Sequence, residues 1–153
     1  MAKQLREHQI TKIYQAIIPA GDYPDELVIN QPICKVPHLI LGTIFGATPD
    51  GKYAHSEMTV LQRHAKKSLV QVKILTGRPH QIRIHMAAIA YPLVGDPLYD
   101  IGGVPKIPAD PQQTALPGDL GYYLRATELK FKHPLTSKEQ HFYGGEKHLD
   151  FLD

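Results

Sequence analysis

The sequence predicts an α+β fold with a mixed, largely antiparallel β-sheet and few helices. Several short segments alternate apolar and polar residues as strands do, and one later segment has a clear helical period. Strands and helices do not alternate regularly enough for a doubly wound fold. The chain has 153 residues, of which 42% are hydrophobic. We therefore expect residues 1–153 to belong to a single domain with a substantial core.

The first part of the chain is predicted to be extended. Residues 12–18 alternate as a strand does and are followed by proline and glycine, which end it. Residues 27–41 hold two apolar runs interrupted by Pro32 and Pro37, which indicates edge strands or extended loop. Residues 53–60 follow an Asp-Gly turn signal and are predicted to form the next strand.

The clearest strand covers residues 68–75, after a basic turn at residues 63–67. Val70 and Val72 alternate with polar residues such as Gln71. This period of two predicts a strand with one packed face and one wetter face.

A helix is predicted directly after this strand. Thr76 is the expected N-cap, and Pro79 suits an early helical position. Tyr91-Pro92 is expected to close the helix. The apolar positions recur at steps of four and three residues and predict one apolar stripe: Ile82, Met86 and Ile89.

The last third of the chain is predicted to be mostly irregular. Residues from about 100 to 121 are rich in glycine and proline, which indicates a long surface loop. Residues 123–131 alternate once more and are expected to form the last strand, ended by His133-Pro134. The remaining tail is polar until Phe151-Leu152.

Composition excludes some classes of protein and leaves others open. No apolar run is long enough to span a membrane, and the first residues do not resemble a secretory signal. Cys34 is the only cysteine, so an intrachain disulfide is excluded, and we expect a cytoplasmic protein. The net charge of +2 permits contact with a polyanion without predicting one.

Chemistry-bearing residues concentrate at residues 75–85, where two arginines and two histidines lie at the junction of strand and helix. Backbone N–H groups at a helix start and the fork of Arg78 together favour an anion site. A solvated first helical turn is an equally good interpretation of the same pattern. His80 and His85 are five residues apart, which does not favour a metal site on one helical face.

The stretch from Leu75 to Tyr99 resembles the signature of RluA-type RNA pseudouridine synthases. The matching residues are Thr76-Gly77-Arg78, His80-Gln81-Ile82-Arg83, His85 and Pro92-Leu93-Val94-Gly95-Asp96. Further similarities occur in the same order as in that family, at Lys12-Ile13-Tyr14, Lys52-Tyr53-Ala54-His55-Ser56-Glu57 and His133-Pro134. Two positions depart from it: Ser56 replaces a usual threonine, and Arg125 replaces a usual histidine.

The resemblance implies a pseudouridine synthase-like catalytic domain that isomerises uridine in ribosomal or transfer RNA without a cofactor. It implies that Tyr14 stacks beside the base and that Arg78 pairs with a catalytic aspartate. Residues expected to line the substrate pocket are Leu75, Thr76, Gly77, His80 and Gln81. Residues expected to contact RNA are Arg83, His85, Lys66 and Lys67. The resemblance implies no metal.

The catalytic aspartate of the family has no match. It lies in an arginine-leucine-aspartate motif before the tyrosine strand, whereas none of the residues before Tyr14 is an aspartate. We therefore expect this chain to be the C-terminal portion of a catalytic domain, in a truncated or split form. A second polypeptide is one source of the missing aspartate. A non-catalytic RNA-binding remnant and a truncated reading frame remain alternatives.

Overall fold

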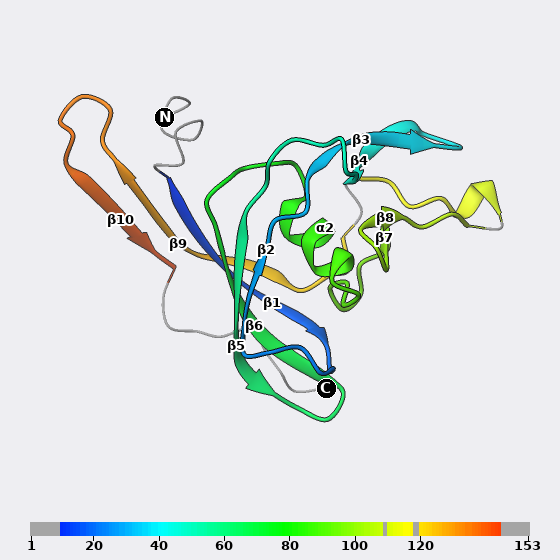
Figure 1. Cartoon of the computed structure of the whole chain (residues 1–153), viewed down its shortest axis with the longest axis horizontal. Coiled ribbons are helices and arrows are strands. Elements are labelled where there is room, and N and C mark those ends of the chain that lie inside the picture. Colours follow the sequence, from blue (N-terminus) through cyan, green and yellow to red (C-terminus); the bar gives the residue numbers. More distant parts are fainter. Residues whose placement is uncertain (1–9, 109, 118–119, 145–153) are drawn as a thin grey trace.

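A six-stranded sheet forms the main body of the computed structural model (Figure 1), which describes residues 10–108, 110–117 and 120–144. The elements of the described part, in chain order, are β1 (Thr11–Pro19), β2 (Glu26–Ile29), β3 (Ile33–His38), β4 (Gly42–Ala47), β5 (Ser56–Arg63), β6 (Lys67–Ile74), α2 (Gln81–Ala88), β7 (Tyr99–Asp100), β8 (Val104–Pro105), the 3₁₀-helix η1 (Pro111–Gln113), β9 (Leu124–Lys132) and β10 (Glu139–Tyr143).

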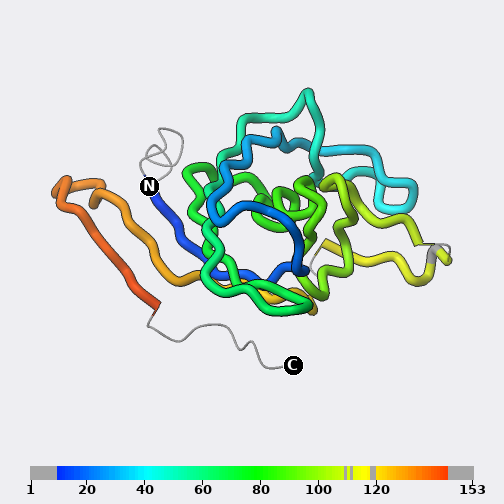
Figure 2. Tube along the Cα trace, turned by 60° about the horizontal axis from the view of Figure 1, so that its bottom comes forward, coloured from blue at the N-terminus to red at the C-terminus, as the bar shows by residue number. Residues whose placement is uncertain are grey.

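The strand order in the main sheet is β10-β9-β1-β6-β5-β2. Every strand pair in the described residues is antiparallel. β1 is therefore central and is hydrogen-bonded on one side to β6 and on the other to β9, which comes much later in the chain. The β9–β10 hairpin and η1 lie at opposite ends of the molecule (Figures 1 and 2). The predicted α+β class with a largely antiparallel sheet is confirmed.

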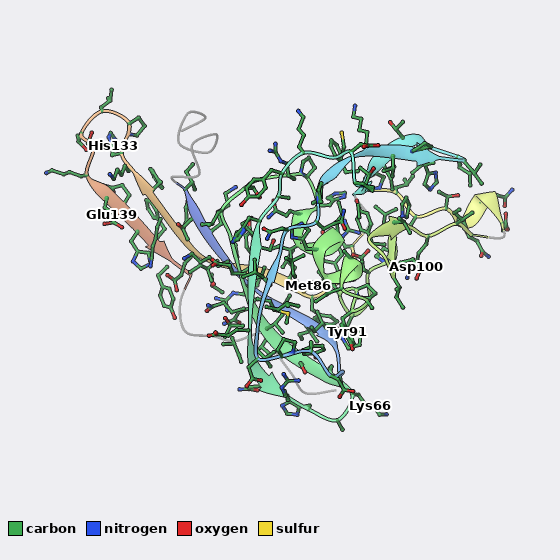
Figure 3. All side chains as sticks on the ribbon, viewed as in Figure 1. Lys66, Met86, Tyr91, Asp100, His133 and Glu139 are labelled. Atoms are coloured by element: carbon green, nitrogen blue, oxygen red, sulfur yellow. The ribbon has the colours of Figure 1, made fainter. Side chains whose placement is uncertain are left out.

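α2 lies between two apolar clusters and is buried on almost every side. Ile82 and Met86 pack with the sheet residues Val70 and Val72, and Figure 3 shows Met86 between helix and sheet. Ile84 belongs to a second cluster with residues of the β3–β4 ribbon and Tyr99. The prediction of one apolar stripe was therefore incomplete, because the β3–β4 ribbon and the β7–β8 pair cover the side of α2 opposite the sheet. No helix in the described part of the chain is long and apolar enough to cross a membrane.

The predicted strands at residues 12–18 and 68–75 correspond to β1 and β6. Residues 27–41 form β2 at the edge of the sheet and β3 in a separate two-stranded ribbon. Pro37 is accommodated within β3 because the ribbon has free edges. The strand predicted at residues 53–60 begins only at Ser56.

One prediction for the last third of the chain was wrong, and another was incomplete. The segment 123–131 is not the last strand, because β10 follows and pairs with β9. β10 is mostly exposed, so it carries no burial pattern that a sequence could reveal. The segment 100–121 is not wholly a surface loop, because β7 and β8 pair within it and Gly103 packs against the interior. A Cβ at Gly103 would lie 2.8 Å from the side chain of Ala47.

A β-bulge interrupts the ladder between β1 and β9 beside Tyr14. Tyr14 pairs with Ala126 and Ile13 pairs with Glu128, so Thr127 is the extra residue of β9. The hydroxyl of Thr127 donates to the carbonyl of Ile13 at 3.0 Å, which satisfies a backbone group at the interruption.

Candidate active site

The turn between β6 and α2 is closed by a glutamine side chain and not by a threonine cap. His80 is the N-cap residue, in the left-handed conformation with φ 55°, and makes no side-chain cap hydrogen bond. The Thr76 hydroxyl donates instead to Oε1 of Gln81 at 2.6 Å and accepts from the His55 backbone N–H. Oε1 of Gln81 also accepts from the Arg78 N–H. The prediction of Thr76 as N-cap was therefore wrong, because its hydroxyl joins this network.

The same network joins the turn to the start of β5. Nε2 of Gln81 donates to the His55 carbonyl and to Oγ of Ser56, both at 3.0 Å. The Ser56 hydroxyl in turn donates to Nδ1 of His85 at 2.8 Å. Because a carbonyl only accepts, Nε2 of His85 carries the proton and donates to the Gln31 carbonyl at 2.8 Å. A chain of hydrogen bonds between buried polar groups therefore fixes the turn relative to the start of β5 and to the segment at Gln31.

Arg83 and Asp96 form a buried ion pair behind the turn. Their side chains are 2% and 0% exposed. The guanidinium donates through Nε and Nη2 to the two carboxylate oxygens at 2.8 and 2.7 Å, a bidentate geometry. Oδ1 of Asp96 also accepts from the backbone N–H of Leu98. Burial raises the pKa of Asp96, but the bonds from Arg83 and Leu98 outweigh it, so this pKa is lowered.

Two tyrosine rings enclose the guanidinium of Arg83. Its Cζ lies 4.2 Å from the ring centroid of Tyr122 and 5.2 Å from that of Tyr99. The Tyr99 hydroxyl donates to the Phe45 carbonyl and accepts from Nδ1 of His80, both at 2.8 Å. These contacts connect α2, β7 and the β3–β4 ribbon into one rigid support for the turn.

A cavity of about 240 Å³ opens between β1 and this turn. It brings Tyr14 and Arg78 to one site, although they lie far apart in the sequence. No aspartate or glutamate is among the described residues that line the cavity. The lining residues are Lys12, Tyr14, Ile74, Gly77, Arg78, His80, Gln81, Ile82, Arg83, Tyr122 and Leu124.

The structure therefore places the predicted pocket residues in different ways. Gly77, His80 and Gln81 line the cavity, whereas Thr76 is buried in the network beneath it. Leu75 is half-buried and is not among the described residues that line the cavity. Its neighbour Ile74 lines the cavity instead.

The residues predicted to contact RNA do not form one surface. Arg83 reaches the cavity wall, but its charge is already paired with Asp96, and His85 is wholly buried. These two predictions do not fit the structure, because neither side chain is accessible to a phosphate. Lys66 and Lys67 lie at the opposite end of β6 from the cavity, and Figure 3 shows Lys66 at the tip of that turn.

Sequence reasoning gave no role to several residues that build the site. Lys12 and Tyr122 line the cavity, and Ser56, Asp96 and Tyr99 hold the turn in place. The available signal was the resemblance to the family, because Lys12, Ser56, Asp96 and Tyr99 all lie in the stretches that carry it, whereas Tyr122 lies outside them.

Burial shifts the pKa of two titratable groups at the cavity. It raises the pKa of Tyr14, so its side chain is a neutral phenol at pH 7. Burial and the nearby charge of Arg83 lower the pKa of His80, so its ring is neutral as well. The positive charge of the described lining therefore comes from Lys12, Arg78 and the paired Arg83.

Comparison with known proteins identifies the family to which this chain belongs. The family model described as RNA pseudouridylate synthase matches residues 1–88. The chain therefore belongs to the RNA pseudouridylate synthase family, within which its relatives are of the RluA type.

Curated relatives and solved structures agree with this assignment. An uncharacterised RNA pseudouridine synthase of Synechocystis sp. is 44% identical over 138 residues, covering 90% of this chain and 46% of that protein. Ribosomal large subunit pseudouridine synthase D of Vibrio cholerae is 33% identical over 146 residues, covering 94% and 44%. The chain thus spans less than half the length of these relatives. The human RNA pseudouridylate synthase domain containing 1 shares the fold, with a TM-score of 0.66 at 20% identity over 95% of this chain and 58% of that one.

The buried His85 predicts a loss of stability in mild acid. Burial lowers its pKa to about 4, whereas an unfolded histidine titrates near 6.5. The unfolded state therefore binds the proton first, and stability present above pH 6.5 is lost as the pH falls towards 4. The expected loss from this group is about 3 kcal/mol of unfolding free energy.

Urea unfolding followed by circular dichroism at pH 7, 5.5 and 4.5 measures this loss. In the variant His85→Gln the slope between pH 6.5 and 4 is expected to shrink to the smaller contribution of His80, whose pKa is also lowered. An unchanged slope in the variant would assign the pH dependence to other groups.

Proposed function

We propose that this chain supplies the C-terminal portion of the catalytic site of an RNA pseudouridine synthase, which isomerises uridine to pseudouridine in ribosomal or transfer RNA without a cofactor. The observation that carries the proposal is the cavity in which Tyr14 from β1 and Arg78 from the signature turn meet. The name of the Vibrio cholerae relative, which refers to the large ribosomal subunit, favours ribosomal RNA as the substrate.

The reaction is an isomerisation, so nothing is added or removed overall. The bond between N1 of uracil and C1′ of ribose breaks, the base turns, and a bond forms between C5 and C1′. C5 loses its proton to solvent, and N1 gains one. The target nucleotide has to leave its stack to reach the cavity, as in other base-modifying enzymes.

The proposed roles follow from the surroundings of each side chain. Tyr14 offers the face of a neutral phenol for stacking on the base, because burial raises its pKa. Arg78 is half-buried and donates through Nε to the Tyr53 carbonyl at 2.8 Å. Its two terminal nitrogens make no hydrogen bond with a described residue, which leaves a fork for a carboxylate.

We further propose that this carboxylate comes from outside residues 1–153. The cavity is lined by cationic side chains and, among the described residues, by no acid. The relatives are more than twice the matched length, which is consistent with an aspartate elsewhere in a longer domain. A preceding segment of the same polypeptide and a second polypeptide are the two possible sources.

A chimera tests the proposal directly. Residues 1–153 replace the matching region of the Synechocystis relative, and release of tritium from RNA labelled at C5 of uridine measures turnover. The chimera is expected to release tritium, and this chain alone is expected to release none, because it lacks the nucleophile. A folded chimera that releases none would contradict the proposal.

Binding of RNA without catalysis is the second candidate function, and the charge of the cavity lining favours it. Lys12 and Arg78 are available to phosphates in the absence of a carboxylate. This function predicts RNA affinity that falls steeply with salt. Such binding, combined with an inactive chimera, would favour this candidate over the enzyme.

A further inference from the structure

One ring nitrogen of His80 is already used behind the cavity. The Tyr99 hydroxyl has a single proton and donates it to the Phe45 carbonyl at 2.8 Å. The hydroxyl oxygen therefore accepts at its 2.8 Å contact with Nδ1 of His80, so Nδ1 carries the proton of this ring. Burial and the nearby charge of Arg83 lower the pKa of His80, so the ring is neutral at pH 7. Its other nitrogen, Nε2, is consequently a hydrogen-bond acceptor.

This Nε2 atom is left for a ligand. His80 lines the cavity, and Nε2 makes no hydrogen bond with a described residue. Within the described part of the chain, Nε2 of His38 is the one buried side-chain polar atom that lacks a partner. Nε2 of His80 is therefore accessible to solvent. The turn thus offers an accessible acceptor at the cavity.

The charged side chains of the described cavity lining only donate hydrogen bonds. Lys12 and Arg78 are cations without an acceptor atom. Oε1 of Gln81 is already occupied by the Thr76 hydroxyl and by the Arg78 N–H. A ligand that fits these groups has acceptors for the cations and a donor for Nε2 of His80. A uridine nucleotide has both, because its phosphate and carbonyl oxygens accept, while its ribose 2′-hydroxyl and its N3–H donate.

We propose that Nε2 of His80 accepts a hydrogen bond from the 2′-hydroxyl of the target nucleotide and that this contact selects RNA over DNA. The inference rests on the proposed function and adds a contact to the sugar of its substrate. In that function the bond at C1′ breaks, and Arg78 holds the catalytic carboxylate there. The 2′-hydroxyl is on the carbon next to C1′, and His80 is two residues from Arg78 in the same turn. The base, with its N3–H, stacks on Tyr14 of β1 in the same proposal. The 2′-hydroxyl is also the group by which a protein distinguishes RNA from DNA at a given site.

Fluorescence anisotropy with a labelled single-stranded RNA of about twelve nucleotides containing one uridine tests this contact. 2′-Deoxy-2′-fluorouridine at that position keeps a ribose-like sugar pucker but cannot donate a hydrogen bond. It is expected to weaken binding to the unchanged chain about threefold to tenfold, the range of one hydrogen bond. In the variant His80→Asn this loss is expected to disappear, because the asparagine side chain ends short of the Nε2 position.

The asparagine variant preserves the other properties of His80. Asparagine tolerates the left-handed backbone at this position, with φ 55°, and its amide N–H can still donate to the Tyr99 hydroxyl. His80→Gly also tolerates this backbone, removes the ring and is expected to give the same result. His64→Asn is the matched control, because His64 is exposed in the turn between β5 and β6, at the opposite end of β6 from the cavity. The control is expected to keep the difference between the two RNAs, and circular dichroism shows which variants are folded.

An equal loss in the unchanged chain and in a folded His80 variant, or no loss in the unchanged chain, would overturn the contact and leave the proposed function intact. An RNA with 3-methyluridine tests the alternative donor, because this base lacks N3–H. A loss with that RNA that disappears in His80→Asn would assign Nε2 to the base and overturn the sugar contact. A complete absence of RNA binding by the unchanged chain would count against the proposed function and the contact together.

Discussion

Replacing Arg83 by alanine will lower the free energy of unfolding by about 3–5 kcal/mol. The substitution leaves the Asp96 carboxylate buried, with 0% side-chain exposure and without its counterion. Domains of this size are typically stable by about 5–15 kcal/mol, so the variant will lie close to the limit of folding. The carboxylate also accepts from the backbone of Leu98, so the loop after α2 will loosen with it.

Urea unfolding of four variants measures this effect: Arg83→Ala, Asp96→Ala, the double variant and the control Lys73→Ala. Lys73→Ala is the control, because the Lys73–Glu57 pair is 3.8 Å long and exposed, and a loss of about 1 kcal/mol or less is expected there. The double variant Arg83→Ala with Asp96→Ala is expected to cost less than the sum of the two single variants, because no lone charge stays buried. Strictly additive costs would show that the two groups do not act as a pair.

Replacing Arg78 by alanine will reduce isomerisation by the chimera at least about a hundredfold, the range seen when a charge-stabilising donor is removed from an active site. In the proposed site this arginine keeps the catalytic carboxylate ionised, and without it the pKa of that carboxylate rises. The fold should change little, since Arg78 is half-buried and its described side-chain hydrogen bond goes to the exposed segment at Tyr53.

Tritium release measures turnover in this variant, and circular dichroism confirms that it is folded. Arg78→Lys keeps the charge without the planar fork and is expected to recover part of the activity. Full turnover by a folded Arg78→Ala variant would contradict this role of Arg78.

Local pattern was enough to predict the strands that carry the site. From Val70 to Ile74, β6 alternates buried and half-buried residues, so its period of two is visible in the sequence. β1 is buried on both faces from Gln15 to Ile18, and its apolar residues indicated the strand. The position of α2 could also be predicted from the sequence, because Ile82 and Met86 recur at helical spacing and pack against the sheet. β10 was invisible for the opposite reason, since its exposed residues follow no burial pattern.

The organisation of the turn depends on contacts that no local pattern contains. From the sequence, Arg83 is expected to be an exposed charge, whereas in the structure it forms a buried ion pair with Asp96. Thr76 looks like a helix cap until Gln81 and His55 take up its hydroxyl. In both cases the decisive partner comes from a different structural element, so the sequence predicted the residue types of the site without their partners.

The extra residue Thr127 divides β9 into two halves. The alternation of side chains between the two faces of the sheet is offset by one residue from one half to the other. Leu124 lies in the first half and lines the cavity, while Glu128 to Lys132 lie beyond the bulge and lead into the β10 hairpin. Removing Thr127 would leave a regular ladder, in which Ala126 and Glu128 keep Tyr14 and Ile13 as partners and still face opposite sides of the sheet. The β9–β10 hairpin beyond this point can therefore change in length without moving Tyr14, whereas deletion of Thr127 would remove the hydroxyl that donates to the Ile13 carbonyl beside it.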